Sequence, residues 1–232
     1  MKKNAKGLRG FIHRYRHAWT LLYVPIYLLW FFHLERTTSP THLHIINFAV
    51  DQTIPFCEYF IIPYYIWFLY MLAVGAFFFL TNRRDYYRYC IFLFTGMSLS
   101  LFICQIWPNG LTLRPDLDAL GRSNIFIEAV RGLYAVDTPT NVCPSIHVLN
   151  SIGATIAVIK SETLSKIKWV RPTGIFLCIA ICASTFFLKQ HSLFDGFCAV
   201  ALCFPLYILA YNPKFLKVEA NVKEEEEVLV HA

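Results

Sequence analysis

The sequence predicts an all-α fold, a polytopic membrane protein whose six transmembrane helices pack as a helical bundle. Of its 232 residues, 56% are hydrophobic and 17% aromatic, while only 16% are charged, against roughly 25% in ordinary soluble domains. A soluble protein of this size could not hide so much apolar surface, so we expect a bilayer to be its solvent. The same composition excludes a disordered chain, a coiled coil and a disulfide-stapled secreted domain.

Six apolar runs account for the expected spans. A membrane-crossing helix needs about 20 apolar residues, and the first three runs and the sixth are long enough. The fourth and fifth have only 15 and 16 residues. We expect these two either to extend into flanking polar residues or to end below the membrane surface around a cavity. In chain order the runs are 18–34, 56–80, 89–107, 145–159, 173–188 and 192–211.

The charge distribution predicts the orientation. If the N-terminus is cytoplasmic, 16 of the 21 Lys and Arg residues fall in cytoplasmic segments, as the positive-inside rule requires. We therefore expect a multi-pass protein of the cell membrane with both termini in the cytoplasm: a basic N-terminus (1–17), a membrane domain (18–212) and a tail (213–232). Topology then explains the net charge of +6, and we expect no nucleic-acid partner.

On this topology three unusual segments share the extracytoplasmic face, although they are far apart in the chain. They are WPNGLTLRPDL (107–117), NVCPSIHV (141–148) and STFFLKQHSLFDGF (184–197). In the last of these, His191 and Asp195 are four residues apart and so share a helix face. A carboxylate beside an imidazole fixes its tautomer and leaves the other ring nitrogen free to attack an electrophile. The alternative is a pair at a helix entry that water satisfies.

The middle segment has the features of an anion site at a helix start. Pro144 suits the first position of a helix, which would put Ser145 and the Ile146 amide in the first turn. Free N–H groups and the helix dipole there favour an anion, typically phosphate. His147 beside them could pass a proton to or from a leaving oxygen. A simple helix cap with an incidental histidine is the alternative.

Two cations could complete such a site. Arg114 and Lys189 both lie outside the expected spans, and an anionic phosphoryl group needs cationic partners during transfer. An ordinary loop arginine is the other interpretation of Arg114. His147, His191 and Asp195 also form a two-histidine, one-carboxylate set of the kind that binds metals. The neighbouring cations and helix N-terminus favour an anion instead, so we expect neither a metal nor another cofactor.

Together the three segments resemble the type 2 phosphatidic acid phosphatase superfamily, whose members carry K-x6-R-P, P-S-G-H and S-R-x5-H-x3-D in that order. Here the second motif is PSIH (144–147), the third is ST-x5-H-x3-D (184–195), and the first survives as Arg114-Pro115. Trp107 stands where the motif has lysine, and Thr185 where it has arginine. The PSIH and KQHS variants look closer to the branch that includes inositol-phosphorylceramide and sphingomyelin synthases than to the main phosphatase branch.

The resemblance implies a role for each matching position. His191 is similar to the nucleophile that becomes a phosphohistidine, and Asp195 to the carboxylate that orients it. His147 resembles the acid that protonates the leaving alcohol and then the base that activates the acceptor. Arg114, Ser145 and the Ile146 amide would hold phosphate oxygens. Lys189 is not part of the family pattern, and we add it as a replacement for one of the two missing cations.

The sequence thus predicts a metal-independent membrane enzyme that acts on a lipid phosphate ester or lipid pyrophosphate. With water as acceptor it is a phosphatase, which we favour because water is always available. With an alcohol as acceptor it is a phosphotransferase that moves a phospho-head group between lipids. A third alternative is an inactive membrane protein that binds an anionic lipid, because two of the motif cations are missing. The sequence does not predict an oligomeric state.

Overall fold

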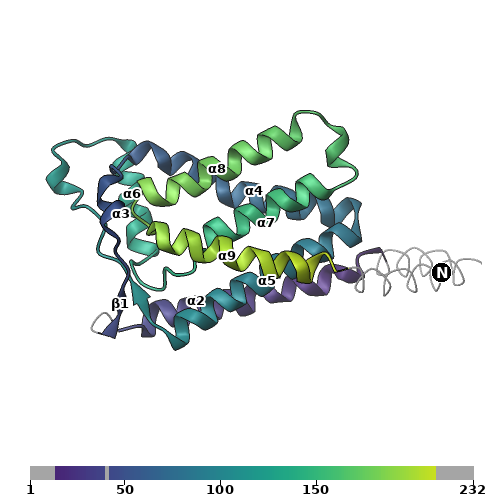
Figure 1. Cartoon of the computed structure of the whole chain (residues 1–232), viewed down its shortest axis with the longest axis horizontal. Helices are drawn as coiled ribbons and strands as arrows, with labels where there is room; N and C mark the ends of the chain where they lie inside the picture. Colours follow the sequence, from purple (N-terminus) through teal and green to yellow (C-terminus); the bar gives the residue numbers. More distant parts are fainter. Residues whose placement is uncertain (1–13, 40–41, 213–232) are drawn as a thin grey trace, which may run out of the picture.

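The computed structural model describes residues 14–39 and 42–212, and it confirms an all-α helical bundle (Figure 1). The expected tail and most of the expected basic N-terminus lie outside the described residues. The helices are η1 (Arg16–Leu22), α2 (Tyr23–Thr37), α3 (Ala49–Thr53), η3 (Glu58–Phe60), α4 (Ile61–Thr81), α5 (Arg83–Ile106), η4 (Asp118–Leu120), α6 (Ile125–Val136), α7 (Ile146–Lys160), η5 (Leu164–Lys166), α8 (Val170–Phe187) and α9 (Leu193–Ala210).

Among residues 14–39 and 42–212, five helical segments are long and apolar enough to cross a membrane. They are Arg16–Thr37, Glu58–Thr81, Arg83–Ile106, Val170–Phe187 and Leu193–Ala210. The fourth expected span, α7, is apolar but has only 15 residues. It lies in the middle of the bundle, in contact with α4, α5, α8 and α9. Its neighbours therefore cover a helix that is short for a membrane span.

Two spans begin earlier than their apolar runs. The third span begins at Arg83 rather than near residue 89, because the Asn82 side chain accepts a hydrogen bond from the Asp85 amide at 3.1 Å and caps the helix there. The link between α4 and α5 is thus the single residue Asn82. The fifth span begins at Val170 rather than at 173 and so includes Arg171, which is the first of the two alternatives expected for a short run.

The core of the bundle is centred on α7. A Cβ added at Gly153 would lie 2.4 Å from the ring of Phe92 on α5, so glycine is required where these two helices approach. Leu149 is completely buried in the same cluster, together with Phe92, Ile181 and Leu206. This close packing fixes the position of α7 relative to α5, α8 and α9, and with it the position of the first turn of α7.

Short elements gather at one end of the bundle, opposite the end where η1 begins and α9 finishes (Figure 1). Strands β1 (His44–Ile45) and β2 (Asn109–Gly110) pair in parallel, and α3 and α6 lie near them. The sequence analysis did not anticipate these elements. Arg122 donates two hydrogen bonds to the buried carboxylate of Glu58, at 2.9 and 2.8 Å, and so ties the long connection before α6 to the start of α4.

Candidate active site

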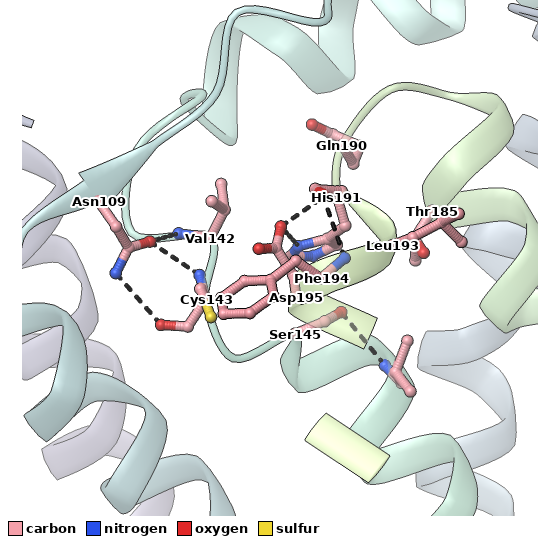
Figure 2. Close-up of polar contacts among 12 residues, drawn as sticks. Asn109, Val142, Cys143, Ser145, Thr185, Gln190, His191, Leu193, Phe194 and Asp195 are labelled. Atoms are coloured by element: carbon pink, nitrogen blue, oxygen red, sulfur yellow. Dashed lines mark hydrogen bonds and ion pairs between the residues drawn. The ribbon is translucent and has the colours of Figure 1, made fainter. Parts of the chain in front are cut away.

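The three polar segments meet at this end of the bundle, and α7 and α9 start side by side there (Figure 2). The backbone amide of Ser145 donates a hydrogen bond to the Asp195 carbonyl at 3.3 Å. The amides of Gln190 and His191 both donate to the Thr185 carbonyl, at 2.9 and 3.1 Å. Backbone contacts therefore join the start of α7, the start of α9 and the end of α8 into one rigid unit.

His191 is held by the carboxylate that the sequence predicted. Its Nδ1 lies 3.3 Å from Asp195 Oδ2, which also accepts the Ser192 amide at 2.9 Å (Figure 2). Ser192 and Asp195 form a capping box at the first turn of α9. Asp195 is completely buried and His191 is 8% exposed. The Nδ1 contact leaves Nε2 as the ring nitrogen that can act as a nucleophile.

Asp51, on α3, is a residue that sequence reasoning missed. Its carboxylate accepts hydrogen bonds from Ser192 Oγ at 2.6 Å and from the Leu193 amide at 2.9 Å. It is 2% exposed. Asp51 lies on α3, far from α9 in the chain. Its contacts hold the start of α9 and, with it, the backbone that carries His191. A single aspartate in a loop gives no sequence signal for such a contact.

Lys189 is placed differently from our expectation. Its ammonium donates to the backbone carbonyls of Asp51, at 2.6 Å, and Ile54. Burial lowers the Lys189 pKa, and the nearby Asp51 charge partly opposes that shift. We expected this lysine to replace a motif cation beside phosphate; in this structure its ammonium is instead engaged by the carbonyls of the α3 segment, and we treat Lys189 as a structural link.

His147 faces His191 across a short gap. The centroids of the two imidazole rings are 5.7 Å apart, and His147 also packs against the rings of Tyr64 (4.6 Å) and Trp67 (4.4 Å) on α4. It is 6% exposed, and its Nδ1 has no hydrogen-bond partner among the described residues. Aromatic packing rather than a carboxylate thus orients this second histidine.

The other two predicted residues of the PSIH segment lie beside His147. Ser145 is completely buried and accepts the Val148 amide through Oγ at 3.4 Å, which makes it the N-cap of α7. Ile146 is the first helical residue, and its amide points along the end of the helix where an anion is favoured. The helix-cap alternative for Ser145 is therefore present in the structure, and the cap leaves the first-turn amides near the two histidines.

Asn109, from the first segment, fixes the turn that precedes this helix. Its Oδ1 accepts the amides of Val142 and Cys143 at 2.9 and 2.8 Å, and its Nδ2 donates to the Cys143 carbonyl at 3.2 Å (Figure 2). Its side chain is completely buried. An asparagine in a Pro-Asn-Gly string reads as a simple turn residue, so sequence alone did not identify this role.

Arg114 reaches the site but is already engaged. Its guanidinium donates to the carbonyl of Asp137 at 2.7 Å and to the side chain of Gln190, the neighbour of His191. It also lies over the ring of Tyr134, 4.3 Å from the centroid. Burial lowers the pKa of Arg114, and the charge of Asp137 is the strongest opposing influence. Arg114 is thus linked to the His191 segment through Gln190.

The hydroxyls of the ST pair do not face the histidines. Ser184 Oγ donates to the Ile181 carbonyl at 2.6 Å, and Thr185 Oγ1 to the Cys182 carbonyl at 2.8 Å, both within α8. Trp107 stacks on the ring of His44 at 5.4 Å. Within residues 14–39 and 42–212, no three His, Cys, Asp or Glu side chains are grouped closely enough to hold a metal ion, so the alternative metal set of the sequence analysis has no assembled site.

A large cavity opens directly beneath the two histidines. Its volume is about 720 Å³, and its lining includes His147, His191 and side chains of α2, α4, α5 and α7. Leu28 on α2 and Leu72 on α4 belong to this lining and are also exposed, at 42% and 68%. The cavity therefore opens sideways between α2 and α4, toward the region that the bilayer occupies.

Most of the cavity wall is apolar, but two acidic side chains line it. Glu35 and Asp137 both line it close to the histidine end. Glu35 accepts hydrogen bonds from Thr138 and, at 3.2 Å, from Asn141, while Asp137 accepts the Tyr64 hydroxyl at 2.9 Å. Neither carboxylate was among the predicted site residues, because each is a single acidic residue in a segment without a motif.

The structure brings together His191, Asp195, His147, Ser145 and Ile146. Arg114 contacts the neighbour of His191 rather than the histidines, and the Lys189 ammonium lies outside this group. No protein-family model, curated protein or solved structure matches the chain.

Proposed function

We propose that this protein is an integral-membrane lipid phosphate phosphatase that works through a phosphohistidine intermediate. One observation supports this most strongly: two histidines from separate helices face each other at the mouth of an apolar cavity, and one of them carries a buried carboxylate partner. A lipid phosphate that enters between α2 and α4 would extend its chains into the cavity and present its phosphate to both rings.

In the proposed first step, Nε2 of His191 attacks phosphorus while the bond from phosphorus to the lipid oxygen breaks. Asp195 accepts a hydrogen bond from the Nδ1–H of His191 and stabilises the positive charge that develops on the ring. His147 gives a proton to the leaving lipid oxygen. First-turn amides of α7 stabilise the equatorial oxygens.

In the second step, His147 takes a proton from water, the water oxygen attacks phosphorus, and the bond from Nε2 to phosphorus breaks. Inorganic phosphate leaves, and both histidines return to their starting protonation. The scheme needs no metal, so we expect EDTA to leave the rate unchanged. Loss of activity in EDTA that zinc restores would contradict the scheme.

A phosphotransferase is the second candidate, because Glu35 and Asp137 at the cavity mouth offer acceptors for the hydroxyl of an alcohol. The first half-reaction is the same, and only the acceptor differs. The same assay separates the two: labelled phosphatidic acid or an isoprenyl phosphate is incubated with purified protein, with and without candidate alcohols, and the products are separated by thin-layer chromatography.

We expect free phosphate from the wild type and none from His191→Ala. His33→Ala is the matched control, because His33 is an exposed histidine on α2 and does not line the cavity. A new phospholipid that appears only with an alcohol would establish the transferase. An intact fold with no product from any lipid would overturn both candidates and leave a lipid-binding protein.

We also propose that both termini are cytoplasmic and that the histidines lie at the extracytoplasmic end of the bundle. The Lys and Arg count supports this orientation. A membrane-impermeant cysteine reagent should then label a cysteine introduced at the exposed Asp118 from outside intact cells. Labelling only after lysis would contradict the orientation.

A further inference from the structure

The two histidines of the site are held by different means. The His191 ring has a carboxylate partner, Asp195, whereas His147 Nδ1 has no hydrogen-bond partner among the described residues. Aromatic rings enclose His147 instead, with the centroid of Tyr64 4.6 Å and that of Trp67 4.4 Å from its own. An imidazole without a polar partner at this nitrogen depends on packing to fix its side-chain torsions. The orientation of the ring therefore depends on α4.

Tyr64 and Trp67 are spaced so that both can hold one ring. They are three residues apart on α4, so their side chains leave the same face of the helix. Tyr64 is 1% exposed and Trp67 is 8% exposed, so most of each ring is in contact with protein. We call these two side chains the aromatic clamp.

The Tyr64 side of the clamp is tied to the segment that carries the proposed nucleophile. Its hydroxyl donates to Asp137 Oδ2 at 2.9 Å, and the Asp137 carbonyl accepts the Arg114 guanidinium at 2.7 Å. Arg114 donates in turn to the side chain of Gln190, the residue before His191. A continuous set of contacts thus runs from the clamp to the His191 segment. The separation of the two imidazole centroids, 5.7 Å, is therefore fixed from both sides.

The proposed reaction makes a demand on His147 that this packing meets. The histidine must give a proton to the leaving oxygen and then take one from water, and each transfer needs a ring nitrogen at hydrogen-bond distance from the reacting oxygen. Nδ1 of His147 is buried against protein, so Nε2 is the nitrogen that remains for both transfers. A flip of the ring would exchange the two nitrogens, and the clamp opposes that flip.

We propose that Tyr64 and Trp67 are positioning residues that hold His147 with Nε2 directed at the leaving oxygen. This inference rests on the proposed function for the role of His147 as acid and base. Both rings line the cavity at its histidine end, but they act through the histidine, so their loss should slow proton transfer rather than weaken lipid binding. A misplaced catalytic group costs up to about 10² in rate.

The test compares two esters that differ in how much they need an acid. Dodecyl phosphate must expel an alkoxide, whereas 4-dodecylphenyl phosphate expels a phenoxide, a much weaker base that needs far less help from a proton donor. Release of alcohol or phenol in the first turnover is followed by rapid quench, with the purified full chain in micelles. We expect Trp67→Leu and Tyr64→Leu to slow alcohol release about tenfold to hundredfold but phenol release about threefold or less, with KM unchanged.

Conservative changes and a neighbouring residue provide the controls. Trp67→Phe and Tyr64→Phe each keep a ring against His147, so both should recover most of the lost rate. Tyr70→Leu removes another buried aromatic side chain of α4, which bonds Thr155 at 3.0 Å and does not line the cavity. It should leave the ratio of the two esters unchanged, whatever its effect on stability. Leucine variants that slow both esters equally, or that raise KM at wild-type kcat, would overturn the proposal.

A second readout needs no turnover and separates the clamp from the proposed function. Neighbouring rings displace the NMR signals of an imidazole, and the ring protons of His147 are assigned by their loss in His147→Gln. These signals should move in Trp67→Leu and stay in place in Tyr70→Leu. Moved signals in a protein whose wild type hydrolyses neither ester would support the clamp and overturn the phosphatase. Hydrolysis of both esters with unmoved signals would support the phosphatase and overturn the clamp.

Discussion

Two adjoining regions of this molecule contrast in the side chains that form them. The site rim, which we define as the Asp51 side chain, Asn109, residues 141–148 and residues 184–195, is dense with hydrogen bonds. Asp51, Asn109 and Asp195 each accept two of them. The cavity below it is lined mostly by apolar side chains.

The difference indicates a division of labour. A rim whose side chains hold one another is preorganised for a reaction that depends on the placement of two rings within a fraction of an ångström. A cavity with mostly apolar walls is suited to the hydrocarbon chains of a lipid. Changes to the rim should therefore affect kcat, and changes to the cavity should affect KM and substrate choice.

The largest effect is expected from Asp195→Asn, which keeps the shape of the side chain but removes the charge beside His191. We expect kcat to fall by about 10²–10⁴, with a thermal midpoint within a few degrees of the wild type. Asp118→Asn, at a 79% exposed aspartate, is the control. An Asp195→Asn enzyme with wild-type kcat would remove the carboxylate from the mechanism.

A smaller loss is expected from Asp51→Asn, which touches neither histidine. An amide keeps one acceptor oxygen but puts a donor against Ser192 Oγ or the Leu193 amide, so the start of α9 shifts. Small misplacements of a catalytic group cost up to about 10² in rate, and we expect a tenfold to hundredfold lower kcat at unchanged KM. A raised KM with normal kcat would mean that Asp51 serves binding rather than positioning.

A change in the cavity should produce the opposite pattern. Met97 lines the cavity on α5, and Met97→Trp would narrow the path of a lipid chain. We expect KM to rise several-fold for a long-chain lipid phosphate, with little change for a short-chain one and none in kcat. Leu99→Trp, at an exposed position on the same helix, should alter neither. Equal effects on long and short chains would show that the chain does not occupy this cavity.

The smallest effect on catalysis is expected from Arg122→Ala, which lies outside both regions. This change leaves the buried Glu58 carboxylate with only Asn124 as a side-chain partner, so the thermal midpoint should fall by a few degrees while kcat and KM stay unchanged. Arg131→Ala, which breaks an ion pair between two exposed side chains, should cost less stability. A large loss of activity in Arg122→Ala would extend the functional rim to this loop.

The sequence predicted the parts of this structure that depend on local pattern. Apolar runs gave the expected helices, and the spacing of four residues put His191 and Asp195 on one face. α5 and α8 start earlier than the apolar runs because charged residues can continue a membrane helix, and at α5 the Asn82 cap favours the earlier start. Run length cannot detect that effect.

The sequence could not predict contacts between loops that are far apart in the chain. Asp51 and Asn109 hold the site from segments about 140 and 30 residues away from their partners, and no local pattern marks them. We expected Lys189 beside phosphate because it lies two residues before His191. The left-handed backbone at this residue (φ 55°) and the nearby carbonyls of the α3 segment instead direct its ammonium to those carbonyls.

The most direct test of the central claim is to identify the phosphorylated residue. Purified protein is mixed with a ³²P-labelled lipid phosphate and quenched in alkali within milliseconds to seconds, and the labelled peptide is sequenced by mass spectrometry. We predict an acid-labile phosphohistidine at His191, absent from His191→Ala and present in His33→Ala. Rapid phosphate release with no labelled protein, or a label on any other residue, would contradict the proposed mechanism.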